Sequence, residues 1–300
     1  MLAQVSPKVR ADVAFYVEDY GAGVSLYDYI LAKQQKSFPR LLPTYEQSQP
    51  SWTEEQRIAA GTQHLMGGQP LLCRGIAKRI TDDDPAELAR SASLYARLRL
   101  WWGTRDEYDC FLNFSNEMLY ALAAGDTFVI ERFAAVTPNV ATSGPWAERL
   151  LHNGIIAVIQ RDEELLASAV DEIDRWTKPK CFIECVYTSL RGLLNRDEQL
   201  VCDGITRFLK NSRRMRPLYE IFKVISLESH GLYELCRWYE PDLVTGFDVD
   251  QGLPWDRGLS AWVRQSTETH PCHDVSALSP TLQEWLTKLP IQDGLRHDWV

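Results

Sequence analysis

The sequence has none of the short motifs that mark common enzyme or cofactor sites. It holds no Gly-rich phosphate-binding loop, no Gly-x-Ser-x-Gly nucleophile turn, no His-Glu-x-x-His pattern and no paired set of metal ligands. It also has no run of 18 apolar residues, and its first residues lack a basic stretch followed by an apolar one. We therefore expect a soluble cytoplasmic protein that does not cross a membrane, is not an enzyme and binds no cofactor or metal.

Basic residues are outnumbered by acidic ones. The chain has 32 Lys and Arg against 41 Asp and Glu, so its formal net charge is −9. Because phosphate contacts need clustered Lys and Arg, this balance argues against a nucleic-acid partner and suits a basic protein partner. The seven cysteines follow no disulfide framework, which predicts buried thiols in a reducing compartment.

A short pattern recurs in the middle of the chain with a period of about 35 residues. Asp126, Asp162 and Asp197 are separated by 36 and 35 residues, and each has apolar residues at the offsets −4, +3, +4 and +8. Those apolar residues are Leu122, Val129, Ile130 and Ala134; Val158, Leu165, Leu166 and Val170; and Leu193, Leu200, Val201 and Ile205. The last three offsets lie on one helical face, and an Asp can accept from free N–H groups where a helix begins. The pattern predicts an all-α fold of stacked antiparallel helical hairpins, a degenerate tetratricopeptide-like array of the kind that usually binds another protein.

We predict a single all-α domain that can be subdivided into N-terminal helices with a loop, a helical-hairpin stack and an irregular C-terminal segment, at residues 1–50, 51–240 and 241–300. Three prolines in residues 38–50 predict a linker or long surface loop. Asp84 and Pro85 predict a helix start, as cap and first helical residue. Residues 218–227 and 230–239 predict one more helical pair before Pro241.

The aromatic and acidic loop at residues 247–255 is the strongest candidate for a binding site. Its aromatic side chains could enter a partner's pocket while neighbouring carboxylates meet Arg or Lys of that partner. The residues expected to bind a partner are Phe247, Asp248, Asp250, Trp255, Asp256 and Glu240. The alternative is that the loop covers the open end of the helical stack with Phe247, Leu253 and Trp255, and both interpretations can hold together.

A metal site is another interpretation of the residues in this part of the chain. His230, His270, Cys272 and His273, with Asp248 and Asp250, are possible ligands, but they lack a second closely spaced pair, so a polar turn is the favoured interpretation.

The chain also resembles a known family. Residues 225–238, Ile-Ser-Leu-Glu-Ser-His-Gly-Leu-Tyr-Glu-Leu-Cys-Arg-Trp, are followed by Pro241 and by an Asp-rich segment that ends in Leu253-Pro254-Trp255. This pattern is similar to the immunity protein 49 family of bacterial polymorphic toxin systems. The resemblance implies an antitoxin that binds a cognate toxin domain and blocks its active site or its assembly. No binding or catalytic residue of the family can be assigned to this sequence from the resemblance. The alternatives are a helical-repeat adaptor or scaffold, and an unfamiliar enzyme that uses His230 with Asp248 and Asp250.

Overall fold

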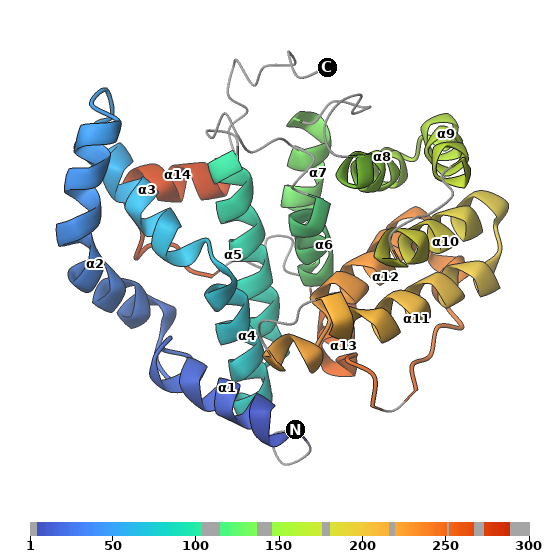
Figure 1. Cartoon of the computed structure of the whole chain (residues 1–300), viewed down its shortest axis with the longest axis horizontal. Helices are drawn as coiled ribbons and strands as arrows, with labels where there is room; N and C mark the ends of the chain where they lie inside the picture. Colours follow the sequence, from blue (N-terminus) through green and yellow to red (C-terminus); the bar gives the residue numbers. More distant parts are fainter. Residues whose placement is uncertain are drawn as a thin grey trace.

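The computed structural model describes residues 5–103, 115–136, 146–175, 181–215, 220–250, 252–266 and 273–288. Over these ranges the chain is all-α and contains no strand, which confirms the predicted fold class (Figure 1). Among the same residues, no helix combines the length and the apolar content that a bilayer span needs.

The N-terminal helices are α1 (Pro7–Glu18), α2 (Leu26–Ser48), α3 (Glu54–Met66), α4 (Gln69–Asp82) and α5 (Pro85–Gly103). Polar caps start several of them: Ser25 accepts from the N–H of Asp28, and Thr53 forms a capping box with Gln56. The predicted helix start at Asp84 is confirmed, because its Oδ1 accepts from the N–H of Glu87 at 3.1 Å.

The predicted loop at residues 38–50 is wrong, because α2 continues through it to Ser48. Phe38, Leu41, Leu42 and Tyr45 have helical spacing and are half-buried. The Phe38 ring packs on Gly61 of α3, and the Tyr45 ring lies 6.0 Å from that of Trp52. Both internal prolines, Pro39 and Pro43, lie one turn apart on the exposed face, where water can satisfy the carbonyl groups that lose an N–H partner.

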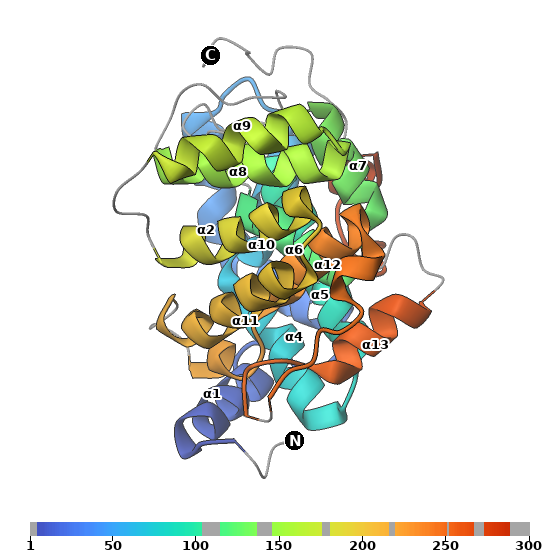
Figure 2. The same cartoon turned by 90° about the vertical axis from the view of Figure 1, so that its right-hand side faces the viewer.

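Three helical hairpins follow, as the repeat predicts: α6 (Ser115–Ala124) with α7 (Thr127–Val136), α8 (Trp146–Gln160) with α9 (Glu163–Asp174), and α10 (Cys181–Asn195) with α11 (Glu198–Met215). Figure 2 shows α8 to α11 lying side by side in one stack.

The three hairpins share one turn. The residue before each Asp has a left-handed φ, which is 70° for Gly125, 56° for Arg161 and 54° for Arg196. The N–H of each following Asp donates to the carbonyl five residues back, and its carboxylate accepts from the N–H three residues on. One helix therefore ends and the next is capped within two residues.

Helix α12 (Leu227–Tyr239) packs against the first helix of every hairpin, α6, α8 and α10 (Figure 2). All residues from Leu227 to Cys236 are buried. A Cβ on Gly231 would lie 2.0 Å from the carbonyl oxygen of Leu119, so only glycine permits this approach to α6. The face of the stack formed by the first helices is thus covered by the chain itself.

The helical pair predicted before Pro241 is only partly correct. Its second helix is α12, but the described residues of its first helix form one turn, the 3₁₀ helix η3 (Glu220–Lys223). The predicted first helix cannot continue to Leu227, because the chain is extended at Ser226, the N-cap of α12.

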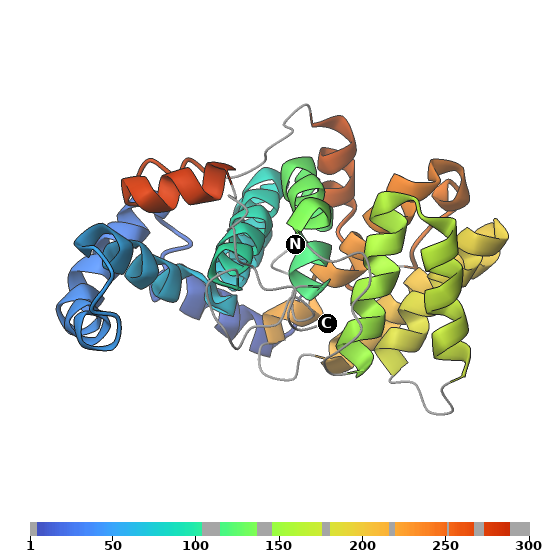
Figure 3. The same ribbon diagram turned by 90° about the horizontal axis from the view of Figure 1, so that it is seen from above.

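The C-terminal part is irregular, as predicted, and returns to the N-terminal helices. The 3₁₀ helix η4 (Pro241–Val244) and a loop lead into α13 (Arg257–Gln265), which packs on α5, and α14 (Pro280–Lys288) packs on α3 and α5 (Figure 3). Arg97 of α5 binds both oxygens of buried Asp126 at 2.8 and 3.0 Å and donates to the Leu286 carbonyl. Asp126, predicted as a helix cap, therefore also joins the stack to the N-terminal helices.

Candidate protein-interaction surface

The loop after η4 is fixed to the protein by a buried ion pair. Arg79 of α4 donates from Nε and Nη2 to the two oxygens of Asp256, at 2.6 and 2.9 Å. Asp256 also caps α13 by accepting from the N–H groups of Gly258 and Leu259. The expectation that Asp256 meets a basic group of a partner is therefore corrected: the carboxylate is buried and its basic group is Arg79 of the same chain.

His230 lies under this loop. Its Nε2 accepts from the N–H of Asp256 at 3.0 Å, so the proton is on Nδ1, which lies 3.1 Å from Ser260 Oγ. Burial lowers the pKa of His230 to about 4, against the opposing charge of Asp256, so the ring is neutral at pH 7. His230 is thus enclosed and fully bonded, whereas Asp248 and Asp250 are exposed; the structure does not assemble these residues into one site.

The two aromatic residues of the loop cover the end of the stack. The Trp255 ring stacks on His230 at 3.8 Å, and Phe247 contacts both Trp255 and Tyr233 at 5.2 and 5.3 Å between ring centres. Phe247 and Trp255 are half-buried against the core of the hairpins. The structure therefore shows the covering role that the sequence left open beside the binding role.

The remaining predicted residues reach the surface. Asp248 is exposed and accepts from Arg257 Nη2 at 2.8 Å, and Asp250 is exposed at the edge of the loop. Glu240 is half-buried and lies 3.6 Å from Arg196 Nη1.

These residues belong to a longer strip, which we call the turn edge and define as residues 161–164, 196–198, 238–240 and 241–250. Contacts join its segments across the stack. Arg161 Nη2 donates to the Trp238 carbonyl at 2.9 Å, and the N–H of Gly246 donates to Glu198 Oε1 at 2.8 Å. The two hairpin turns, the end of α12 and the loop thus form one connected surface.

The turn edge is strongly acidic. It contains nine carboxylates and two arginines, Arg161 and Arg196. Seven of the carboxylates are exposed: Asp162, Glu163, Glu164, Glu198, Asp242, Asp248 and Asp250. Sequence reasoning found only the last part of this strip. The rest could have been predicted from the aligned repeats. The residues that flank Asp162 and Asp197 occupy equivalent turns, so they lie along one edge of the stack.

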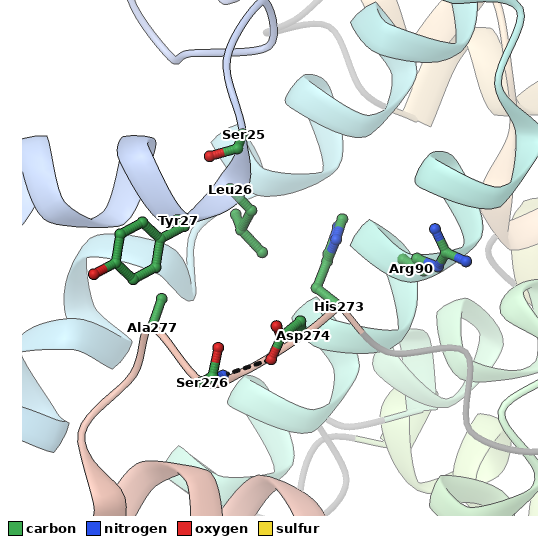
Figure 4. Close-up of a pocket in the computed structure, with 8 residues that line it drawn as sticks. All are labelled: Ser25, Leu26, Tyr27, Arg90, His273, Asp274, Ser276 and Ala277. Atoms are coloured by element: carbon green, nitrogen blue, oxygen red, sulfur yellow. Dashed lines mark hydrogen bonds between the residues drawn. The ribbon is translucent and has the colours of Figure 1, made fainter.

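A cavity of about 580 Å³ lies between the start of α2, α5 and the segment before α14 (Figure 4). In Figure 4, His273 stands between Tyr27 on one side and Arg90 on the other. Beneath the cavity, His273 Nε2 lies 3.2 Å from Ser91 Oγ and its Nδ1 lies 3.6 Å from Glu87 Oε2.

Ser91, His273 and Glu87 follow one another as the serine, histidine and carboxylate of a serine hydrolase triad do. However, Ser91 has an exposed fraction of 0% and packs against Gly75 of α4. A substrate in the cavity could not reach the Ser91 hydroxyl. Glu87 also bonds buried Arg74 at 2.5 Å, and burial together with the cations nearby lowers the pKa of His273 to about 3. We interpret the group as the attachment of the C-terminal segment to α5.

No set of three or more His, Cys, Asp or Glu in the described ranges is spaced to hold a metal ion. Of the candidate metal ligands, His230 bonds the N–H of Asp256 and His273 lies beside Ser91. His270 and Cys272 lie outside the described ranges. Comparison of the chain with protein-family models, curated proteins and solved structures gives no match. The resemblance to the immunity protein 49 family remains a prediction.

Proposed function

We propose that the turn edge binds a basic surface of another protein, and that the chain is a cytoplasmic immunity protein whose partner is a bacterial toxin domain. The observation that carries the proposal is the composition of the turn edge, nine carboxylates against two arginines on one connected strip. The resemblance described above supplies the class of partner.

The segments of the turn edge are held by hydrogen bonds within the chain. Asp162 and Asp197 cap α9 and α11 through bonds of 2.9 and 3.1 Å to the N–H groups of Leu165 and Leu200. Arg161 and Glu198 bind the end of α12 and the loop, respectively. Because the strip is held in place, binding costs little additional ordering of the chain.

Inhibition would work by occlusion. A toxin that acts on nucleic acid or nucleotides needs a basic substrate site, and the exposed carboxylates would take the place of the anionic substrate. Opposite charge also speeds the encounter of the two proteins, so association should slow as salt is added. The covered face of the stack supports the same choice of surface, since α12 already fills the place where a peptide would bind.

The test begins with co-expression of this chain and the product of the gene immediately upstream, scored by cell survival and co-purification. The double variant Glu164→Lys/Asp242→Lys is expected to weaken the complex by about tenfold or more, because both carboxylates are exposed on the turn edge. The control is Glu18→Lys/Glu46→Lys, which changes the net charge equally on the distant helices α1 and α2.

Survival that requires this chain, together with selective loss in the first variant, would support the proposal. Equal weakening by both variants would mean that overall charge, and not the turn edge, governs binding. A neighbour that is not toxic and forms no complex would exclude the immunity role with that partner and favour the adaptor.

A further inference from the structure

A small cavity opens beside the turn edge. Its volume is about 280 Å³, and it lies between the end of α4, the loop before α13 and the first turn of α13. Its walls include Asp250, Leu253 and Trp255 of the loop, together with Arg79 and Arg257. The loop runs close to α4 on its way to α13 (Figure 2).

Each charged group of the cavity wall, with one exception, has a partner of opposite charge within the chain. Arg79 binds both oxygens of Asp256 and also bonds Asp83. Arg257 Nη2 donates to Asp248 at 2.8 Å and to the Val249 carbonyl at 3.0 Å.

Asp250 is the exception. Its carboxylate is exposed and makes no hydrogen bond or ion pair with any residue that the structure describes, while its carbonyl accepts from the N–H of Leu253. The charge available at the cavity is therefore negative.

An aromatic ring faces the same space. Trp255 lines the cavity and is held by its stack on His230 and by edge contacts with Phe247 and Tyr233 at 5.2 and 5.5 Å. A neutral His230 adds no positive charge beneath the indole. A ring and a free carboxylate that line the same cavity suit a planar cation, because a guanidinium can stack on the indole while its N–H groups bind the carboxylate.

We propose that this cavity receives an arginine side chain of the bound protein, stacked on Trp255 and paired with Asp250. The inference rests on the proposed function and adds to it the residue type that anchors the partner. A buried arginine with an aromatic contact is a common centre of binding energy in protein interfaces. The Asp250 side chain lies at the surface, so its replacement leaves the fold unchanged.

The first experiment needs no partner. Nα-acetyl-arginine amide is titrated into the protein while the indole N–H signals are followed by NMR, with Trp255→Phe identifying the signal of Trp255. We expect a saturable shift of that signal, no shift with the neutral citrulline analogue, and at least a tenfold weaker response in Asp250→Asn. The control Asp171→Asn removes an exposed carboxylate of α9 and is expected to respond as the wild type.

Equal shifts with citrulline, or wild-type binding by Asp250→Asn, would overturn the inference. If Trp255→Phe does not fold, the test still stands. The indole signals of Asp250→Asn and Asp171→Asn can each be compared directly with those of the wild type as the probe is added.

The second experiment uses the complex with the toxin. Asp250→Asn is expected to weaken it by about tenfold and Asp171→Asn by less than about twofold. A complex that both variants form equally well would refute the arginine anchor and leave the proposed function standing. Binding of the arginine probe without any toxin complex would support the arginine site and refute the proposed function.

Discussion

Replacing Arg79 by methionine would remove a guanidinium that is 7% exposed and leave the carboxylate of Asp256, 2% exposed, without its cation. Removing one partner of a buried ion pair typically costs about 3–5 kcal/mol, because the other charge stays buried. We expect Arg79→Met to lower the free energy of unfolding by that amount, which is at least about a fifth of the 5–15 kcal/mol of a typical domain. Urea unfolding followed by far-UV circular dichroism measures this loss.

A second substitution tests the cause. Asp256→Asn keeps an oxygen that can accept from the N–H groups capping α13 but removes the charge. If the unpaired charge is what destabilises Arg79→Met, the double variant Arg79→Met/Asp256→Asn is more stable than Arg79→Met alone. Arg257→Met, which breaks the exposed pair with Asp248 and the bond to the Val249 carbonyl, is the control and is expected to lower the free energy of unfolding by no more than about 1 kcal/mol. Additive losses in the double variant would refute the reasoning.

Two further predictions concern α12. Gly231→Ala would place a methyl group 2.0 Å from the Leu119 carbonyl oxygen and is expected to cost about 2 kcal/mol by urea unfolding. Gly154→Ala is expected to cost much less, because its closest neighbour is the movable end of the Leu190 side chain and Tyr187 lies at an ordinary contact distance of 3.4 Å. Protonation of buried His230 opposes folding, since its pKa is about 4 in the folded protein and near 6.5 when unfolded. Its contribution is therefore fully present above pH 6.5 and is lost as the pH falls towards 4. Unfolding curves across this range should show a weaker pH dependence for His230→Gln than for the wild type, and equal slopes would contradict the assignment.

The helix caps and hairpin turns, which depend only on residues close together in the sequence, could be predicted. The turns at Asp126, Asp162 and Asp197 need only a carboxylate at a helix start and apolar residues on one face of the helix. The caps at Thr53 and Asp84 follow from the same short-range chemistry. The hydrogen bonds of these turns and caps join residues no more than five positions apart, so the local spacing of residue types determines them.

The error at residues 38–50 came from counting prolines instead of following the helical spacing. A proline breaks a helix where its missing N–H and its ring disturb a packed face. Pro39 and Pro43 lie on the exposed face of α2, and the half-buried face carries Phe38 and Tyr45. The apolar period was therefore the stronger signal.

The role of Asp256 could not be predicted from its neighbours, because its partner Arg79 is 177 residues away. An Asp at a helix start looks the same in sequence whether it faces solvent or a buried guanidinium.

The exposure of the loop residues, by contrast, follows a pattern that is visible in the sequence. Half-buried Phe247, exposed Asp248, buried Val249 and exposed Asp250 alternate as they do in an extended chain.

The same repeat that builds the fold also limits the binding surface. In the second and third hairpins the Asp is followed by further exposed carboxylates, Glu163 with Glu164 and Glu198, so these two turns contribute to the turn edge. In the first hairpin Asp126 is fully buried on Arg97, and Thr127 follows it. That turn serves the internal contact between the stack and α5 and adds no charge to the surface. On the proposed function, we expect a partner's basic surface to extend from the start of α9 across the end of α12 to the loop at Asp250, and not to use the turn before α7.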